Sequence, residues 1–146
     1  MKKKYCFHFI VLLAVFLSCN DDKEDMSAQI DKIQEQSLIG KWILIGYSNE
    51  GVFCDLEGRI KNEMYICFKE DGKMEGKICN ELYGKYAITA GGGLAISDCY
   101  CTKMLSDDDE INFAEEQIVS GIKAFCITKG HLRLYFSDNG YIEFRP

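Results

Sequence analysis

The sequence has little of what catalytic and nucleic-acid-binding sites require. Proline occurs once, at the last position, and tryptophan occurs once, as Trp42. Gly91-Gly92-Gly93 lacks the lysine and the following helix of a phosphate-binding loop. No serine lies in the context of a nucleophile elbow. The formal charge is −6, and no basic cluster follows the first few residues. This balance argues against nucleic acid and against anionic lipid headgroups as partners.

Histidine is also scarce. His131 is the only histidine after the first 18 residues, and it falls in a predicted hairpin turn. One histidine without a neighbouring nucleophile or ligand set does not define an acid–base or metal site. No pair of carboxylates stands out as a hydrolytic pair. The sequence therefore predicts no catalytic residue, no metal site and no cofactor.

The first 19 residues combine a basic start, a short apolar run and a cysteine. Three lysines follow Met1, and residues 5–17 are apolar apart from one histidine. This run is shorter than the roughly 20 residues that a membrane-spanning helix needs. The pattern predicts a secretory signal peptide over residues 1–18. Leu17-Ser18-Cys19 resembles the end of a bacterial lipobox, which implies cleavage before Cys19 and its lipidation, including palmitate. An ordinary signal peptide with an incidental cysteine is the alternative.

A charged, hydrophilic segment follows Cys19. Residues 20–25 are Asn-Asp-Asp-Lys-Glu-Asp and bury no apolar surface, so we expect a flexible acidic linker over residues 19–37. An acidic run at this place resembles the export signal of surface lipoproteins in one group of Gram-negative bacteria. We therefore expect an outer-membrane lipoprotein, on the cell surface or on the periplasmic face. Removing residues 1–18 from 146 leaves 128 residues, and the loss of three lysines changes the charge from −6 to −9.

Six cysteines remain after Cys19, and an even number in an exported domain predicts a disulfide framework. They are Cys54, Cys67, Cys79, Cys99, Cys101 and Cys126. The sequence does not choose among the possible pairings. Cys99 and Cys101 are two apart on a predicted strand and so point to one face. Together with Cys79 they form an alternative candidate, a thiol redox or metal-binding site.

Residues 38–146 are predicted to form one domain made mostly of strands. Alternating, β-branched and aromatic runs predict strands at residues 41–47, 64–69, 74–79, 84–89, 94–97, 125–128, 132–136 and 141–144, with 99–104 as an extension or a further strand. Asp71-Gly72 and Asn139-Gly140 predict tight hairpin turns. The fold class is therefore mainly β (α+β), an antiparallel sheet curled into an open barrel that hides its edges.

One helix is predicted before the last three strands. Residues 107–110 are acidic, and Ile111, Ala114, Ile118 and Ile122 follow at helical spacing. Acids at a helix start favour the positive end of the dipole, and an aspartate can cap it. A calcium loop is the alternative, but its glycine and spaced ligands are missing.

The order of several short signals resembles the META domain family, also called HslJ-like. These signals are Leu38-Ile39-Gly40-Lys41-Trp42, Cys79-Asn80, Gly84-Lys85-Tyr86, Leu94-Ala95-Ile96, Thr102-Lys103-Met104, Glu115-Glu116 and Leu132-Arg133-Leu134. The resemblance implies an antiparallel, barrel-like β structure with one helix. The family occurs in envelope lipoproteins and stress-related proteins and has no assigned reaction, so the resemblance implies such a role for this chain. The family usually has a cysteine where this chain has Ser106, so Cys99 and Cys101 are alternatives for pairing with Cys79.

The sequence therefore predicts a lipid-anchored, non-enzymatic envelope protein that binds a ligand or maintains the envelope under stress. Its expected partners are the membrane, through the lipid on Cys19, and an unknown protein or small molecule. Gly40-Lys41-Trp42 is also similar to the start of lipocalin-like barrels, so a carrier of an apolar ligand is one alternative function. The thiol redox or metal-binding protein is the other.

Overall fold

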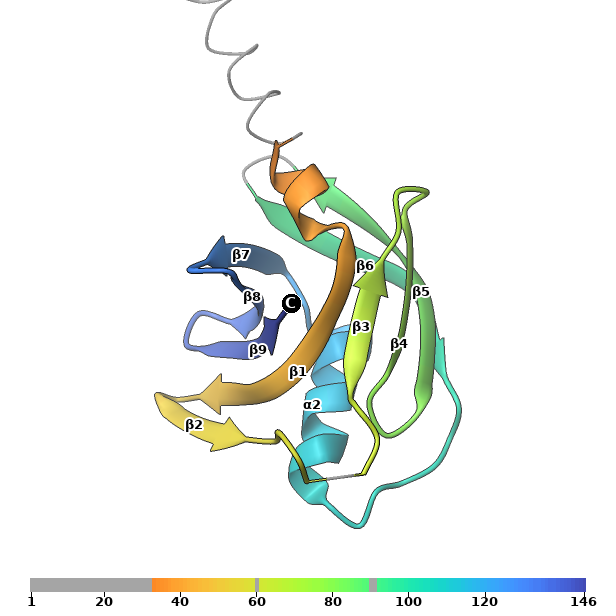
Figure 1. Cartoon of the computed structure of the whole chain (residues 1–146), viewed down its shortest axis with the longest axis vertical. Coiled ribbons are helices and arrows are strands. Elements are labelled where there is room, and N and C mark those ends of the chain that lie inside the picture. Colours follow the sequence, from red (N-terminus) through yellow and green to blue (C-terminus); the bar gives the residue numbers. More distant parts are fainter. Residues whose placement is uncertain (1–32, 60, 90–91) are drawn as a thin grey trace, which may run out of the picture.

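The computed structural model describes residues 33–59, 61–89 and 92–146 (Figure 1). The predicted signal peptide, Cys19 and most of the predicted linker lie outside these residues. Residues 33–38 are helical and lead into the first strand. Leu38 is fully buried, and the Trp42 indole donates a hydrogen bond to its carbonyl oxygen at 2.8 Å. Within the described residues no helix is both long enough and apolar enough to cross a membrane.

Nine strands form one antiparallel sheet, and one helix precedes the last three strands. The elements are β1 (Gly40–Asn49), β2 (Val52–Asp55), β3 (Tyr65–Phe68), β4 (Lys73–Lys77), β5 (Glu81–Thr89), β6 (Gly93–Cys101), α2 (Asp109–Ser120), β7 (Ala124–Thr128), β8 (His131–Ser137) and β9 (Gly140–Arg145). The strand order is β2-β1-β3-β4-β5-β6-β7-β8-β9. The predicted fold class is confirmed.

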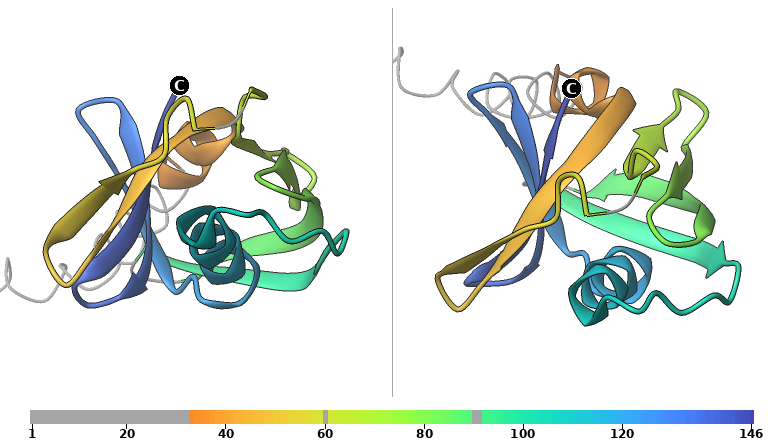
Figure 2. Two further views of the ribbon diagram at one scale, coloured as in Figure 1. Left: turned by 90° about the horizontal axis from the view of Figure 1, so that it is seen from below. Right: turned by 60° about the horizontal axis from the view of Figure 1, so that its bottom comes forward.

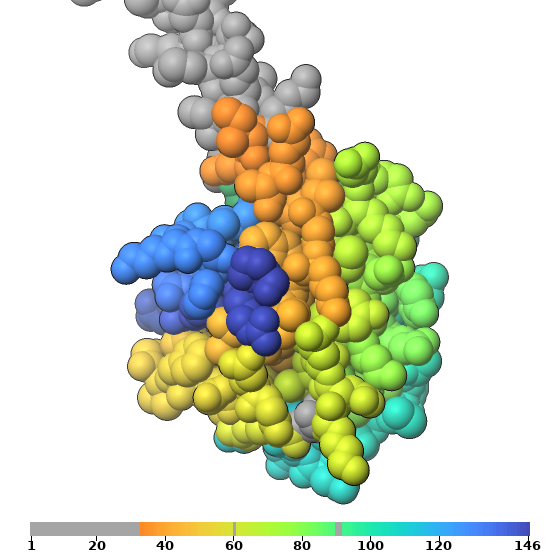
Figure 3. Space-filling model, in the orientation of Figure 1, coloured from red at the N-terminus to blue at the C-terminus, as the bar shows by residue number. Residues whose placement is uncertain are grey.

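Strand β1 closes the sheet into a ring because it pairs with three other strands. Its first residues pair with β3, its middle with β9 and its last residues with β2. The space-filling view shows β9 at the end of the chain lying against β1 (Figure 3). The strand pairing on the opposite side of the ring is weak, because β6 and β7 share only the pair Gly93 and Ala124. The sheet is therefore a ring-like arrangement that is open on this side.

Helix α2 lies at this weak side, between β6 and the β7–β9 part of the sheet (Figure 2). Ile111, Ala114 and Ile118 are fully buried on its inner face, as the predicted periodicity requires. The predicted fourth position, Ile122, is outside the helix, because α2 ends at Ser120 and Gly121 caps it. The helix therefore supplies the core cover that the sheet lacks between β6 and β7.

The predicted acidic cap of this helix is also present. Asp108 is the N-cap residue, and its carboxylate accepts hydrogen bonds from the backbone N–H groups of Glu110 and Ile111. Arg59 pairs with Asp108 at 3.2 Å and also with Glu110. Burial tends to raise the pKa of Asp108, but the guanidinium and the two N–H groups outweigh it and hold that pKa below its usual range. The cap is thus charged at neutral pH and stabilises the positive helix end.

The interior of the ring is filled by side chains from most strands and from α2. Leu44, Ile66, Phe68 and Phe144 are among the fully buried ones. Phe68 packs edge-on against Tyr86 with ring centroids 5.0 Å apart, a preferred geometry for aromatic pairs. The centre of the ring is therefore a packed core.

Candidate functional site

A buried carboxylate on α2 ties the helix to the sheet. Glu115 is only 7% exposed, although it is an acid in the middle of a helix. Its Oε2 accepts hydrogen bonds from the backbone N–H groups of Cys79 (3.0 Å) and Asn80 (2.7 Å). Its Oε1 accepts a third from the Asn80 side-chain amide at 2.6 Å. Hydrogen bonds to an ionised acceptor are among the strong ones, and they compensate for the burial of the charge.

Asn80 carries the same network to the segment after β6. It is 4% exposed and lies in the turn between β4 and β5. Its Nδ2 also donates to the Met104 carbonyl oxygen at 2.8 Å, and its Oδ1 accepts from the Met104 N–H at 2.7 Å. The Thr102 hydroxyl donates to the same Oδ1 at 3.1 Å. One asparagine thus fixes the Thr102–Met104 segment against the β4–β5 turn. We call Asn80, Thr102, Met104 and Glu115 the latch.

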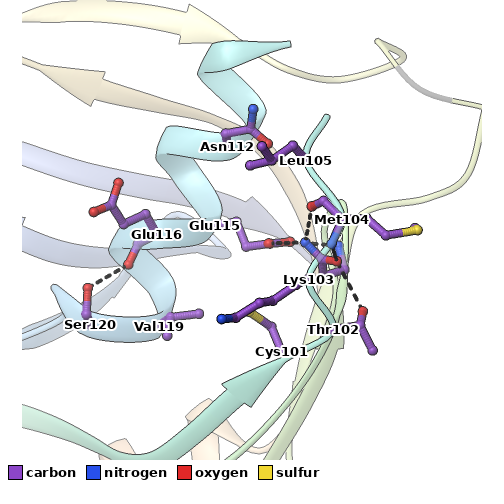
Figure 4. Close-up of a pocket in the computed structure, with 11 residues that line it drawn as sticks. Cys101, Thr102, Lys103, Met104, Leu105, Asn112, Glu115, Glu116, Val119 and Ser120 are labelled. Carbon is purple, nitrogen blue, oxygen red and sulfur yellow. Dashed lines mark hydrogen bonds between the residues drawn. The ribbon is translucent and has the colours of Figure 1, made fainter. Parts of the chain in front are cut away.

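The latch forms one wall of a cavity of about 570 Å³ beside α2. Cys101, Leu105 and Val119 contribute apolar lining, while Asn112, Glu116 and Ser120 add polar groups from the helix (Figure 4). This volume lies within the usual range for small-molecule sites, which are mostly apolar with a few polar groups. The sequence did not predict this cavity, because it depends on where the helix lies against the end of β6.

Two features of the cavity bear on what it can hold. The polar atoms of Glu115 and Asn80 are engaged with each other and with backbone groups, so the inner wall offers mainly apolar contact. Lys103 is exposed, and Figure 4 shows its side chain extending past Cys101 toward Val119 on α2. Leu105, at the edge, is 90% exposed. The cavity therefore combines an apolar wall with one cation, Lys103, and one exposed carboxylate, that of Glu116.

None of the six predicted disulfide cysteines is bonded to another in the structure, and the disulfide framework stays a prediction. Five of them lie on strands β2, β3, β6 and β7, and Cys79 lies in the turn between β4 and β5. Cys126 is exposed on β7, and Cys67 on β3 has Glu75 as its cross-strand partner. The Cys54 sulfur lies 3.4 Å from an Arg59 nitrogen. The Cys79 thiol donates to the Met104 carbonyl oxygen at 3.7 Å, so this cysteine contacts the latch.

The alternative thiol site receives little support from its surroundings. Cys99 and Cys101 are both half-buried on β6, with the exposed Tyr100 between them, so they share a face as predicted. Burial raises the pKa of Cys99, and the neighbouring Cys101 adds to the shift. Burial also raises the pKa of Cys79, with a further contribution from the Glu115 charge. A raised pKa lowers the thiolate fraction and hence the reactivity that redox and metal-binding cysteines need.

The remaining sites considered from sequence are structural. Ser106 stands where the META domain family usually has a cysteine. Its hydroxyl oxygen accepts a hydrogen bond from the Asp108 backbone N–H at 3.1 Å and so supports the start of the helix. His131 begins β8, and its Nδ1 lies 2.9 Å from a carboxylate oxygen of Glu143. In the part of the chain that the structure describes, no group of three or more His, Cys, Asp and Glu residues is placed to hold a metal ion.

Comparison with known proteins identifies the domain. The META domain family model matches residues 36–146. A protein solved by NMR shares 21% identity with a TM-score of 0.58, covering 76% of this chain and 92% of that one. An NMR structure from Burkholderia xenovorans shares 17% identity with a TM-score of 0.62, covering 77% and 86%. A DUF4847 family protein from Bacteroides vulgatus shares 16% identity with a TM-score of 0.54, covering 77% and 96%. These three show the fold, and no curated protein matches the sequence.

The latch yields a direct stability test in Glu115→Gln. The amide group of glutamine would place a donor against donors from Cys79 and Asn80, so one buried polar group would lose its partner. We expect the free energy of unfolding to fall by about 1–3 kcal/mol in urea titrations. Glu116→Gln is the matched control, because Glu116 is the next residue on the same helix and is exposed. Equal stabilities of the two variants would contradict a stabilising role for the latch.

Proposed function

Because the chain belongs to the META domain family, we propose that it is a lipid-anchored, non-catalytic binding protein of the bacterial envelope. Its ligand would be a small amphiphile with an apolar body and an anionic head, held in the cavity beside α2. The observation that carries this proposal is the combination of an apolar wall and the Lys103 cation in one cavity of about 570 Å³.

The chemistry of the cavity favours binding over catalysis. Its buried acid, Glu115, accepts three hydrogen bonds from protein donors, so it is held in place as an acceptor. A general acid or base must instead lie within hydrogen-bond reach of the proton that moves. The apolar lining from Cys101, Leu105 and Val119 favours the burial of hydrocarbon. The cavity thus has the features of a holding site.

The location of the cavity also separates this proposal from a lipocalin-like carrier. A lipocalin-like ligand would occupy the interior of the ring. Here that interior is filled by fully buried side chains such as Leu44, Ile66 and Phe144. The proposed ligand instead lies at the side of α2, where it contacts the helix and the segment after β6. A ligand at this place would stabilise the same region that the latch holds together.

The proposed anchor is the lipid on Cys19. A basic start, a short apolar run and Leu17-Ser18-Cys19 support a lipoprotein signal. Stable attachment to a membrane takes more than one acyl chain, a condition that a triacylated cysteine meets. The acidic segment after Cys19 would then space the domain from the bilayer, on the cell surface or in the periplasm.

The anchor is tested by metabolic labelling of the full chain in a Gram-negative host with an alkyne analogue of palmitate. We expect Cys19→Ser to abolish the label, because the acylated side chain is missing. Cys126→Ser is the matched control, since Cys126 is exposed on the domain and should leave labelling unchanged. Label retained by Cys19→Ser would reject the anchor.

The ligand class is tested with laurate as a probe, titrated calorimetrically into the full chain. Val119→Trp fills the cavity with a large ring and should abolish binding. Val52→Trp is the matched control, because Val52 is an exposed valine on β2 outside the cavity lining. Lys103→Met keeps an apolar side chain of similar reach but removes the charge. We expect this change to weaken laurate binding about tenfold and to leave dodecanol binding unchanged.

Three results would contradict the amphiphile proposal. They are absence of laurate binding by the wild type, binding unaffected by Val119→Trp, and an equal effect of Lys103→Met on laurate and dodecanol. The last result would show that the anionic head does not contribute to binding. Either of the first two would show that the cavity is not the binding site.

A further inference from the structure

A second hollow lies on the outer face of the sheet, across β4, β5 and β6. It has a volume of about 400 Å³ and is lined by Glu75, Tyr83, Lys85, Asp98 and Tyr100, among others. It shares no lining residue with the cavity beside α2. Most of its side chains are ordinary for a solvated sheet face. The two tyrosines differ, because they lie together and form a contiguous exposed aromatic patch, a feature that marks interaction surfaces.

Tyr83 and Tyr100 form an exposed aromatic pair. They are direct cross-strand partners on β5 and β6. Their rings are 30° from parallel with centroids 6.0 Å apart, a separation at which rings are offset and do not cover each other fully. Tyr83 is 42% and Tyr100 66% exposed. The pair therefore presents open ring surface to a ligand.

A β-bulge adds to the shape of the hollow. The register between β5 and β6 shifts between Tyr83 and Lys85, because Asp98 and Cys99 of β6 both lie opposite Gly84 of β5. The bulged strand is therefore β6, where Asp98 has a φ of 49°. Gly84 lines the hollow without a side chain, next to the aromatic pair. Bulges are often used to re-aim neighbouring side chains. Here the bulge leaves a depression beside two rings that the strand holds in place.

The charges around the hollow are already paired within the protein. Lys85 pairs with Asp98 at 2.8 Å, and Lys69 pairs with Glu75. Lys73, which also lines the hollow, pairs with Asp71. Each cation thus has its own carboxylate, so the hollow carries no unbalanced charge of either sign among these groups. A charged ligand would have to compete with these pairs, whereas a neutral ligand with hydroxyl groups could hydrogen-bond to both partners.

The Tyr83 hydroxyl group is suited to the same kind of ligand. The Tyr83 hydroxyl donates to a Glu81 carboxylate oxygen at 3.2 Å. The Glu81 charge raises the pKa of Tyr83 above its ordinary value, and the hydrogen bond and burial contribute further. Tyr83 therefore stays neutral and keeps its hydroxyl proton throughout the physiological range.

We propose that the hollow at Tyr83 and Tyr100 binds a neutral saccharide. One face of a pyranose ring carries mainly C–H groups, which pack on aromatic rings, while its edge carries hydroxyl groups that donate and accept. The exposed ring pair provides the first contact, and the Lys85–Asp98 and Lys69–Glu75 pairs provide both donors and acceptors around it. Single-stranded nucleic acid also stacks on aromatic rings, but it needs a positively charged groove that this hollow does not have.

The test uses the full chain in a detergent without a sugar head group. Cellohexaose and maltohexaose are the neutral probes, and a hyaluronan hexasaccharide is the anionic one. Binding is followed by saturation-transfer NMR and calorimetry. We expect a neutral hexasaccharide to bind with a Kd of about 1 mM, and the affinity to change little with salt, because no net charge is neutralised.

Substitutions locate the site. Tyr100→Ala and Tyr83→Ala should each weaken the binding about tenfold, while Tyr100→Phe keeps the ring and should bind like the wild type. Phe53→Ala is the matched control, because Phe53 is an exposed aromatic residue on β2 away from the hollow. Circular dichroism checks that each variant is folded, and Val119→Trp separates this hollow from the cavity beside α2.

The proposal is overturned by any of three outcomes. These outcomes are a failure of both neutral probes to bind, binding that survives both tyrosine-to-alanine changes, and binding of the anionic probe alone. Loss of saccharide binding in Val119→Trp as well would also count against it, because it would place the saccharide in the cavity beside α2. Failure of laurate to bind leaves this test unaffected, since the two sites share no lining residue.

Discussion

The structure depends on one buried carboxylate, that of Glu115. The nine-stranded sheet is held between β6 and β7 by a single residue pair, so α2 must cover that side. The apolar face of α2 provides much of the burial, but apolar contact alone does not fix how far the helix slides or rotates. Three hydrogen bonds from Cys79 and Asn80 to Glu115 set that position. An acid left without these donors would carry a large desolvation cost, so the helix has one favoured position.

The latch joins the fold to the proposed function because the same residues make the cavity wall. Asn80 holds the segment through Met104 close to the turn before β5, and that segment borders the cavity with Lys103 and Leu105. The saccharide hollow lies elsewhere, on the outer face of the sheet. A domain tethered through a lipid at its N-terminal end would then present two separate binding surfaces, one for an amphiphile and one for a polyhydroxylated ring.

Much of the fold could be predicted from local sequence, but the site could not. The strands with clear alternation and the capped helix at Asp108 are present where the patterns indicate. The sequence does not predict strand β2, because its turn is Glu50-Gly51, with both residues at positive φ. This geometry suits a two-residue hairpin, yet glutamate is an unusual residue there. The burial of Glu115 and the open Tyr83–Tyr100 pair depend on packing and cross-strand register between distant segments. A helical acid or a lone tyrosine gives no local signal of either.

The most direct test of the latch is hydrogen exchange of individual backbone amides, measured by NMR in the native protein. The Cys79 and Asn80 N–H groups lie in a turn, where amides ordinarily exchange fast through local opening. If Glu115 holds them, they will exchange as slowly as the amide of Ile66 in the core strand β3. Fast exchange at Cys79 and Asn80, with Ile66 still protected, would contradict the account.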